Sequence, residues 1–250
     1  QIPIVCVPAS IDNNLPGSEL SIGTDTALNN AVVALDSIKL SAAASHRCFV
    51  AEVMGRKCGY LSLMSGLATG AEKVYLNEEG ITLAGLAADS ERMVESFRSG
   101  RSLYLVIRNE RASVNYTTDV LAHIFAEEGK GLYDVREAIL GHQQQGGSPT
   151  AFDRIMATKL VAHSLELLAC ALKRGEPTAS YVGLMGGKVS DQPLDRMNDD
   201  LDRDHRRPRH QWWLGLRPAV GLVSQDIGTL TLHDVPDFGE AVDDAASDQR

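Results

Sequence analysis

The chain has 250 residues, of which 44% are hydrophobic, and its formal net charge is −9. This length and apolar content allow a substantial core in one large domain or two small ones. The acidic balance argues against a nucleic-acid surface, and the longest apolar runs are too short and interrupted to span a membrane, so the sequence predicts a soluble protein.

Cysteine usage and the start of the chain bear on compartment and completeness. The four cysteines are far apart, with no C-x-x-C pair: Cys6, Cys48, Cys58 and Cys170. Neither a disulfide framework nor a zinc site is therefore predicted, and a reducing, cytoplasmic location is expected. The first residue is Gln1 and a strand-like run follows at once, which indicates part of a longer protein.

Apolar periodicity predicts strands and helices in alternation. Residues 2–7 are apolar and β-branched, 24–43 have helical spacing, and 48–54 return to a strand, which makes one βαβ unit. The alternation continues with helices at 59–70, 82–97, 117–129 and 150–174, and strands at 73–76, 102–107, 133–140 and 180–189. This pattern predicts an α/β fold with Rossmann-like, mostly parallel sheet layers, helices on both faces, and ligands at the carboxyl ends of the strands.

The last fifty residues are less regular. Residues 203–210, "RDHRRPRH", read as a solvated or interface patch with no assigned ligand, and Trp212-Trp213 as a structural anchor. From Asp226 onward there are seven acidic residues against one arginine. We therefore expect residues 226–250 to form a mobile acidic tail.

The loops that follow the strands carry the chemistry. One holds Asp12, and a second, "EVMGRKCG", enters a helix where backbone N–H groups and an arginine can meet an anion. The strand "LYLVIRNE" ends near Glu110, and "LGHQQQGGSPTAFDR" combines His142 with two glycines before a helix. These loops and their strands offer four cations and two acceptors, a set that suits a phosphorylated, hydroxyl-rich small molecule: Arg47, Arg56, Arg136, His142, Asp12 and Glu110.

Four motifs make the chain recognisable. "SIDNNLPG", "EVMGRKCGYL", "RNE" and "GHQQQGGSPTAFDR", in this order and spacing, resemble the ATP-dependent 6-phosphofructokinase family, which phosphorylates fructose 6-phosphate at its 1-hydroxyl. The likeness extends over residues 2–216, and "YVGLMGGKV" with "HRRPRHQWWLGLRP" resembles the C-terminal repeat of the long, tandem-repeat form. The resemblance implies that residues 1–225 are a partial phosphofructokinase domain, its sugar-phosphate-binding portion.

The resemblance implies roles in the first two motifs. Asp12 matches the aspartate base that takes the proton from the attacking sugar hydroxyl, and Ser10 belongs to the same substrate-binding loop. Met54, Gly55 and Arg56 match the segment beside the sugar and the transferred phosphoryl, with Arg56 catalytic. The next acidic position of the aspartate motif, on the magnesium–nucleotide side, is Asn14 in this chain, which weakens metal handling.

The remaining motifs imply binding of the sugar phosphate. Glu110 matches the carboxylate that holds sugar hydroxyls, while Arg47 and Arg136 match arginines that reach a sugar phosphate across a subunit or repeat interface. His142 matches the histidine of GHxQRGG, but the arginine of that motif is Gln145 here. Replacing a charged fork by a neutral amide would cost about 1–3 kcal/mol of phosphate binding.

The nucleotide side is not visible in the sequence. No Walker A pattern occurs, and no G-x-G-x-x-G follows a strand. The resemblance implies ATP and Mg²⁺ as cofactors, with a nucleotide site mostly outside this chain and metal ligands that stay unassigned. We therefore expect the 250-residue chain alone to be inactive, and expect either a homo-oligomer or pairing with another repeat, because the sites are completed across an interface.

Two function classes remain open, as does the choice of ATP or pyrophosphate as donor. Asp12 favours a glycolytic kinase, whereas Asn14, Gln145 and the long-form C-terminus favour a regulatory repeat that binds a sugar bisphosphate effector, such as fructose 2,6-bisphosphate, without catalysis; a scaffold repeat is a weaker third reading. Simpler interpretations also stand: Asp12 as a turn former, Arg47 as a helix-end charge, Glu110 as a solvated strand end.

Overall fold

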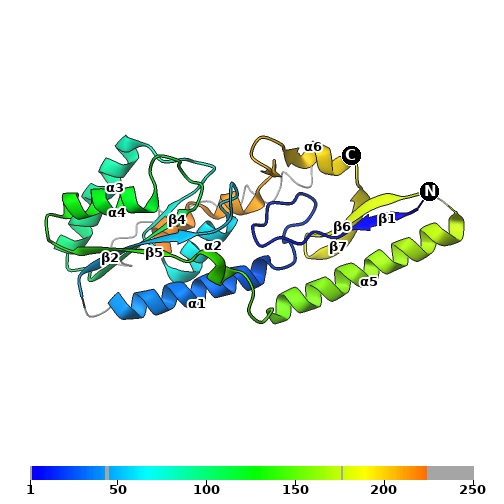
Figure 1. Cartoon of the computed structure of the whole chain (residues 1–250), viewed down its shortest axis with the longest axis horizontal. Coiled ribbons are helices and arrows are strands. Elements are labelled where there is room, and N and C mark those ends of the chain that lie inside the picture. Colours follow the sequence, from blue (N-terminus) through cyan, green and yellow to red (C-terminus); the bar gives the residue numbers. More distant parts are fainter. Residues whose placement is uncertain (1, 43–44, 176, 224–250) are drawn as a thin grey trace.

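In the part of the chain that the structure describes, the larger of two main sheets has four strands. The computed structural model describes residues 2–42, 45–175 and 177–223. Within these ranges, four parallel strands lie in the order β3-β4-β2-β5 (Figure 1). Their bounds are Lys73–Tyr75 for β3, Leu103–Asn109 for β4, Arg47–Val53 for β2 and Asp134–Ile139 for β5.

Helices cover both faces of this sheet because alternate side chains of each strand point to opposite sides. On β2, Phe49 and Ala51 pack in one core with α1 (Thr24–Ala42) and α2 (Tyr60–Thr69). Cys48 and Val50 face the opposite core, with α3 (Leu83–Arg98) and α4 (Thr118–Gly129). The predicted α/β fold with helices on both faces is thus confirmed.

A second, smaller sheet lies beside the first and corrects the predicted pairing. β1 (Ile4–Cys6) runs parallel to β6 (Ala179–Met185), and β6 is antiparallel to β7 (Lys188–Pro193). The prediction of one βαβ unit was therefore wrong, because β1 and β2 belong to different sheets. The single strand predicted over 180–189 was also wrong: Gly186 and Gly187 have φ of 56° and 73° and turn the chain into a hairpin.

The helix α5 (Ala151–Arg174) packs against the smaller sheet (Figure 1). It has 24 residues, and its most apolar 18-residue window has a mean hydropathy of 1.5 and is 22% buried. The expectation that no apolar run could span a membrane is corrected here, since α5 is long and apolar enough by length and composition. Core helices of soluble proteins pass the same test, and α5 contributes Met156 and Leu160 to the core over β6.

The C-terminal part returns from the small sheet to the large one. It comprises short elements: α6 (Arg196–Asp200), β8 (Leu201–Asp202), β9 (Arg207–Pro208), η2 (Trp212–Leu216) and α7 (Ala219–Val223). Trp213 is 2% exposed, and its ring meets that of Tyr60 on α2 edge-on at 5.9 Å. Trp213 is thus a structural anchor, as expected, whereas Trp212 is 50% exposed. The acidic tail falls outside the described residues.

Candidate functional site

The candidate site forms where the loops after β1, β2 and β4 meet. The residue Asp12 is 7% exposed, and Arg56 Nε lies 3.4 Å from its carboxylate oxygen Oδ2. The backbone N–H of Arg56 donates to Glu110 Oε1 at 2.7 Å. Three residues singled out in separate motifs are therefore brought together by the tertiary structure.

The Asp12 loop is closed by its own polar residues. Asn13 adopts a left-handed conformation with φ of 53°, donates through Nδ2 to the carbonyl of Glu19 at 2.9 Å, and accepts from the Ser21 N–H at 2.9 Å. Ser10 Oγ accepts from the Asp12 N–H at 3.2 Å and donates to Asn14 Oδ1 at 2.8 Å. The polar density that marked this loop as a site thus fixes its shape, and Ser10 orients Asp12 from within.

The loop of Met54, Gly55 and Arg56 needs its glycine. Gly55 has φ of 138°, and a Cβ added there would lie 2.4 Å from the carbonyl oxygen of Cys58. Arg56 follows in the left-handed region with φ of 50°, which costs free energy for a residue with a Cβ. Its side chain is 75% exposed, so most of the guanidinium faces outward, open to a ligand.

Burial makes Asp12 more basic than an ordinary aspartate. Desolvation raises the pKa of Asp12 above its usual value, while the Arg56 cation lowers it and the Glu110 carboxylate raises it. The raised pKa makes Asp12 a better proton acceptor at neutral pH, and Arg56 favours the ionised form that can accept.

The fourth loop reaches this cluster through a residue that sequence reasoning missed. Gln144, in η1 (Gly141–Gln144), is 1% exposed and accepts the Met54 N–H through Oε1 at 2.8 Å. Within the described ranges its Nε2 has no hydrogen-bond partner. His142 and Gln145, the residues selected from the motif, are exposed on either side of it. Three consecutive glutamines gave no signal of which one points inward.

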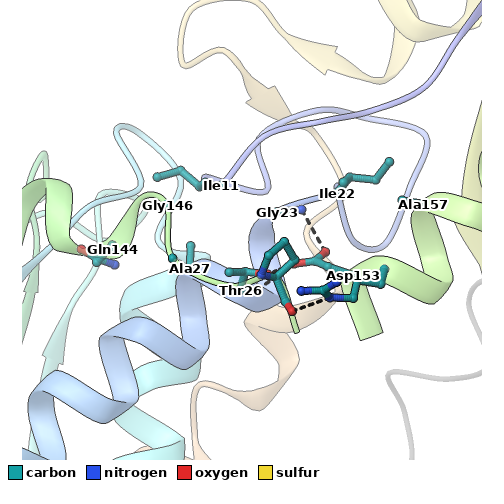
Figure 2. A pocket seen from close by; sticks show the side chains of 12 residues that line it. Ile11, Ile22, Gly23, Thr26, Ala27, Gln144, Gly146, Asp153 and Ala157 are labelled. Atoms are coloured by element: carbon teal, nitrogen blue, oxygen red, sulfur yellow. Dashed lines mark hydrogen bonds between the residues drawn. The ribbon is translucent and has the colours of Figure 1, made fainter. Parts of the chain in front are cut away.

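A cavity of about 360 Å³ opens beside the Asp12 loop, between the starts of α1 and α5 (Figure 2). Asp153 is 3% exposed in its wall and accepts from the backbone N–H groups of Gly23 and Thr26 at 2.9 and 2.8 Å. This carboxylate satisfies donors at the N-terminus of α1 and joins the two helices. The other lining residues are Ile11, Ile22, Ala27, Gln144, Gly146, Gly147, Pro149, Arg154 and Ala157.

The structure leaves Arg47 and Arg136 away from Asp12. Both approach the carboxylate of Asp134, Arg47 Nε at 4.0 Å and Arg136 Nη2 at 3.5 Å. Arg47 begins β2 and Met54 follows its end, so about 20 Å separates them along the strand. Within one chain these arginines form a separate basic pair on the β2–β5 side of the sheet.

The described residues do not fit a Mg²⁺ site. Among residues 2–42, 45–175 and 177–223, no group of three or more His, Cys, Asp or Glu side chains is arranged to hold a metal ion. Asn14, the residue expected from the sequence on the metal side of the motif, already accepts from Ser10 through its Oδ1. Asp12 is ion-paired with Arg56.

A known protein family matches the part of the chain that holds these loops. The Phosphofructokinase family matches residues 1–168. The chain is 45% identical over 236 residues to ATP-dependent 6-phosphofructokinase of Dictyostelium discoideum, which covers 94% of this chain and 28% of that protein. It is 41% identical over 235 residues to the human muscle-type enzyme, covering 90% and 30% of the two chains.

Solved structures agree with the family match. Phosphofructokinase from Saccharomyces cerevisiae superposes with a TM-score of 0.85 at 36% identity, covering 89% of this chain and 31% of that one. The Pichia pastoris enzyme in the T-state gives 0.83 at 34% identity, with 92% and 28% covered. The chain thus spans less than a third of the length of these relatives. By its sequence and its fold, it belongs to the phosphofructokinase family.

Proposed function

We propose that the protein acts as a 6-phosphofructokinase, transferring a phosphoryl group from ATP to the 1-hydroxyl of fructose 6-phosphate in glycolysis. This chain would supply the base and the sugar-phosphate half of the site. The observation that carries the proposal is the junction of Asp12, Arg56 and Glu110, which places a buried carboxylate beside an outward-facing arginine. The relatives at 41–45% identity are ATP-dependent 6-phosphofructokinases.

In this proposal Asp12 accepts the proton of the sugar 1-hydroxyl as that oxygen attacks. Phosphoryl transfer to an alcohol needs an in-line hydroxyl, a carboxylate to take its proton, and positive charge near the moving phosphoryl. The exposed guanidinium of Arg56 supplies that charge. Glu110 uses Oε1 to hold the Arg56 backbone, and its Oε2 is the acceptor we assign to a sugar hydroxyl.

The sugar phosphate would be held by the basic pair of a second copy or repeat. The Arg136 side chain is 58% exposed and lies 3.5 Å from the carboxylate of Asp134, which is also exposed, so the guanidinium is available to a phosphate. Arg47, His142 and Gln145 complete the proposed clamp, with Gln145 as a neutral donor. Because Arg47 and Arg136 lie far from Asp12 in one chain, this assignment implies self-association or repeat pairing.

ATP and Mg²⁺ would bind largely outside the described residues. When bound, they supply the transferred phosphoryl group and neutralise its developing charge. This chain would contribute Asp12, Arg56 and the sugar contacts. We also propose that the protein is cytoplasmic.

A regulatory repeat that binds a sugar bisphosphate without catalysis is the second candidate. It is favoured by Asn14, whose Oδ1 is used within its own loop, and by the neutral Gln145. Both candidates use the same sugar and phosphate contacts. They differ in whether Asp12 accepts a proton during a reaction.

Steady-state kinetics of Asp12→Ser in the complete protein, with any second repeat's site silenced, separates the candidates. A positioned base contributes about 10²- to 10⁴-fold in rate, so the kinase proposal expects such a fall in kcat with little change in KM. Asp119→Ser, a change of an exposed aspartate on α4, is the matched control. Turnover of Asp12→Ser within a few-fold of the parent would exclude Asp12 as the base. No turnover in the parent itself, once the second site is silenced, would assign the site to the regulatory class.

A further inference from the structure

A C-terminal segment lies across the back of the Arg56 loop. We name residues 204–217 the C-terminal strap. Lys57 Nζ donates to the carbonyl of Asp204 at 2.9 Å, and Arg207 Nη1 donates to the carbonyl of Lys57 at 2.7 Å. Trp212 Nε1 donates to the carbonyl of Glu19 in the Asp12 loop at 3.2 Å. The strap therefore contacts two of the loops that form the site.

An ion pair shielded from solvent joins the C-terminal strap to the residues around the start of α2. Arg207 Nη1 lies 3.0 Å from Glu78 Oε1, and the two side chains are 12% and 6% exposed. The Glu78 carboxylate also accepts the N–H of Gly59, the N-cap of α2, at 3.0 and 3.1 Å, and the Nε2 of Gln211 at 2.9 Å. Charge-assisted bonds of this kind are strong, and removing one partner leaves the other charge uncompensated.

Hydrogen bonds hold the backbone on both sides of the Arg56 side chain. On one side its own N–H is held by Glu110, and on the other the next carbonyl, of Lys57, is held by Arg207. Its left-handed φ of 50° is sparsely populated for a residue with a Cβ, and such conformations persist when surrounding contacts over-determine them. Loss of one of these hydrogen bonds would let the backbone relax and turn the guanidinium away from Asp12.

We propose that Arg207 is a positioning residue, and that the C-terminal strap holds Arg56 in the conformation that places its guanidinium against Asp12. The strap contains the basic cluster of the sequence, and Arg207 is the member turned inward: Arg203, Arg206 and Arg209 are exposed. The catalytic consequence rests on the proposed kinase function, whereas the positioning itself does not.

Arg207→Met tests the proposal, with Arg203→Met as the matched control. Hydrogen exchange of the amides of residues 55–59 should accelerate about tenfold in Arg207→Met, because a local opening becomes easier, while amides in β4 keep their rates. Carbon-13 NMR titration of the Asp12 carboxyl should show a pKa above that of the parent, since Arg56 no longer lowers it. A merely structural contact would not move the Asp12 pKa. Arg207→Lys, which keeps a cation, should recover part of both effects.

The outcomes divide clearly. If Arg207→Met matches Arg203→Met in exchange and in the Asp12 pKa, the positioning role is wrong. If Arg207→Met does not fold, Gln211→Leu, which removes a neutral partner of Glu78, must accelerate exchange at residues 55–59, or the strap has no hold on the loop. Neither readout requires turnover, so a protein without kinase activity would overturn the proposed function and leave this test standing.

Discussion

Arg56 Nε lies 3.4 Å from the carboxylate of Asp12, although the two residues belong to different loops and to motifs that are separate in the sequence. The pair is unequal: the Asp12 side chain is 10% exposed and that of Arg56 is 75% exposed. The carboxylate therefore loses most of its hydration, while the arginine keeps its freedom to meet a ligand. This asymmetry suits a proton acceptor beside an arginine that is open to a ligand.

The buried carboxylate predicts a pH-dependent stability. Because the folded pKa of Asp12 is raised by desolvation, the ionised form is disfavoured in the native state, and the parent loses free energy of unfolding as pH rises from the unfolded pKa through the folded one. Asp12→Asn removes this loss. Its free energy of unfolding relative to the parent should therefore increase between pH 3 and pH 7, as measured by urea unfolding. A difference independent of pH would show that folding does not raise the pKa of Asp12.

Replacing Arg136 by leucine should weaken sugar-phosphate binding by about 1.5–3 kcal/mol, the worth of a charge-assisted contact. Folding should be unaffected, since the side chain is 58% exposed. Calorimetry with fructose 6-phosphate and fructose 1,6-bisphosphate measures the change, and Arg174→Leu at the exposed end of α5 is the control. Affinity equal to that of the control would show that Arg136 is a solvated surface residue that does not bind the phosphate.

Gly55→Ala should destabilise the protein more than the same change at another glycine with a positive φ. A Cβ would approach the Cys58 carbonyl oxygen to 2.4 Å, whereas a Cβ at Gly80, which also has a positive φ of 70°, meets nothing within 4 Å. Gly80→Ala thus measures the cost of a left-handed φ without a clash, about 1 kcal/mol. Gly55→Ala adds both the clash and a φ of 138°, far outside the left-handed helical region, and should lose about 1–3 kcal/mol more. Equal losses in thermal unfolding would mean that the loop yields without strain.

Gln144→Met should loosen the link between two of the site's loops. The change leaves the Met54 N–H without its acceptor, and a buried unsatisfied donor costs about 1–3 kcal/mol. Faster hydrogen exchange at Met54 is the expected local signature. Gln143→Met, one residue earlier and exposed, should change neither exchange nor stability. Unchanged exchange at Met54 in Gln144→Met would contradict the link.

The 250-residue chain, expressed alone, should not phosphorylate fructose 6-phosphate in excess ATP and magnesium. Positioning and electrostatic stabilisation of the phosphates supply nearly all catalysis in phosphoryl transfer, and the sequence contains no glycine-rich phosphate loop of a known pattern. The assay follows fructose 1,6-bisphosphate formation by monodisperse protein. Production above that of Asp12→Ser would reveal a phosphate-binding element within the chain.

Local sequence determined much of the architecture. Apolar patterns predicted the type and approximate bounds of α1 to α5 and β2 to β5, because the helices repeat apolar residues at a period near 3.6 and the central strands are short, nearly continuous apolar runs. The motifs around Asp12, Met54 and Glu110 identified three loops that do meet. The loops after β2 and β4 meet because neighbouring parallel strands present their carboxyl ends at one edge, whereas the Asp12 loop comes from β1 in the other sheet. Family membership followed from the same motifs.

Only the tertiary structure decided which distant segments pair. Nothing in residues 2–7 says that β1 joins β6 rather than β2, because strand pairing depends on long-range packing and not on periodicity. The choice of Gln144 over its neighbours, and of Arg207 within a basic cluster, likewise depended on which side chain is turned into the interior. Identical residue types in sequence become different once burial separates them, because a desolvated polar group must find a partner that a solvated one does not need.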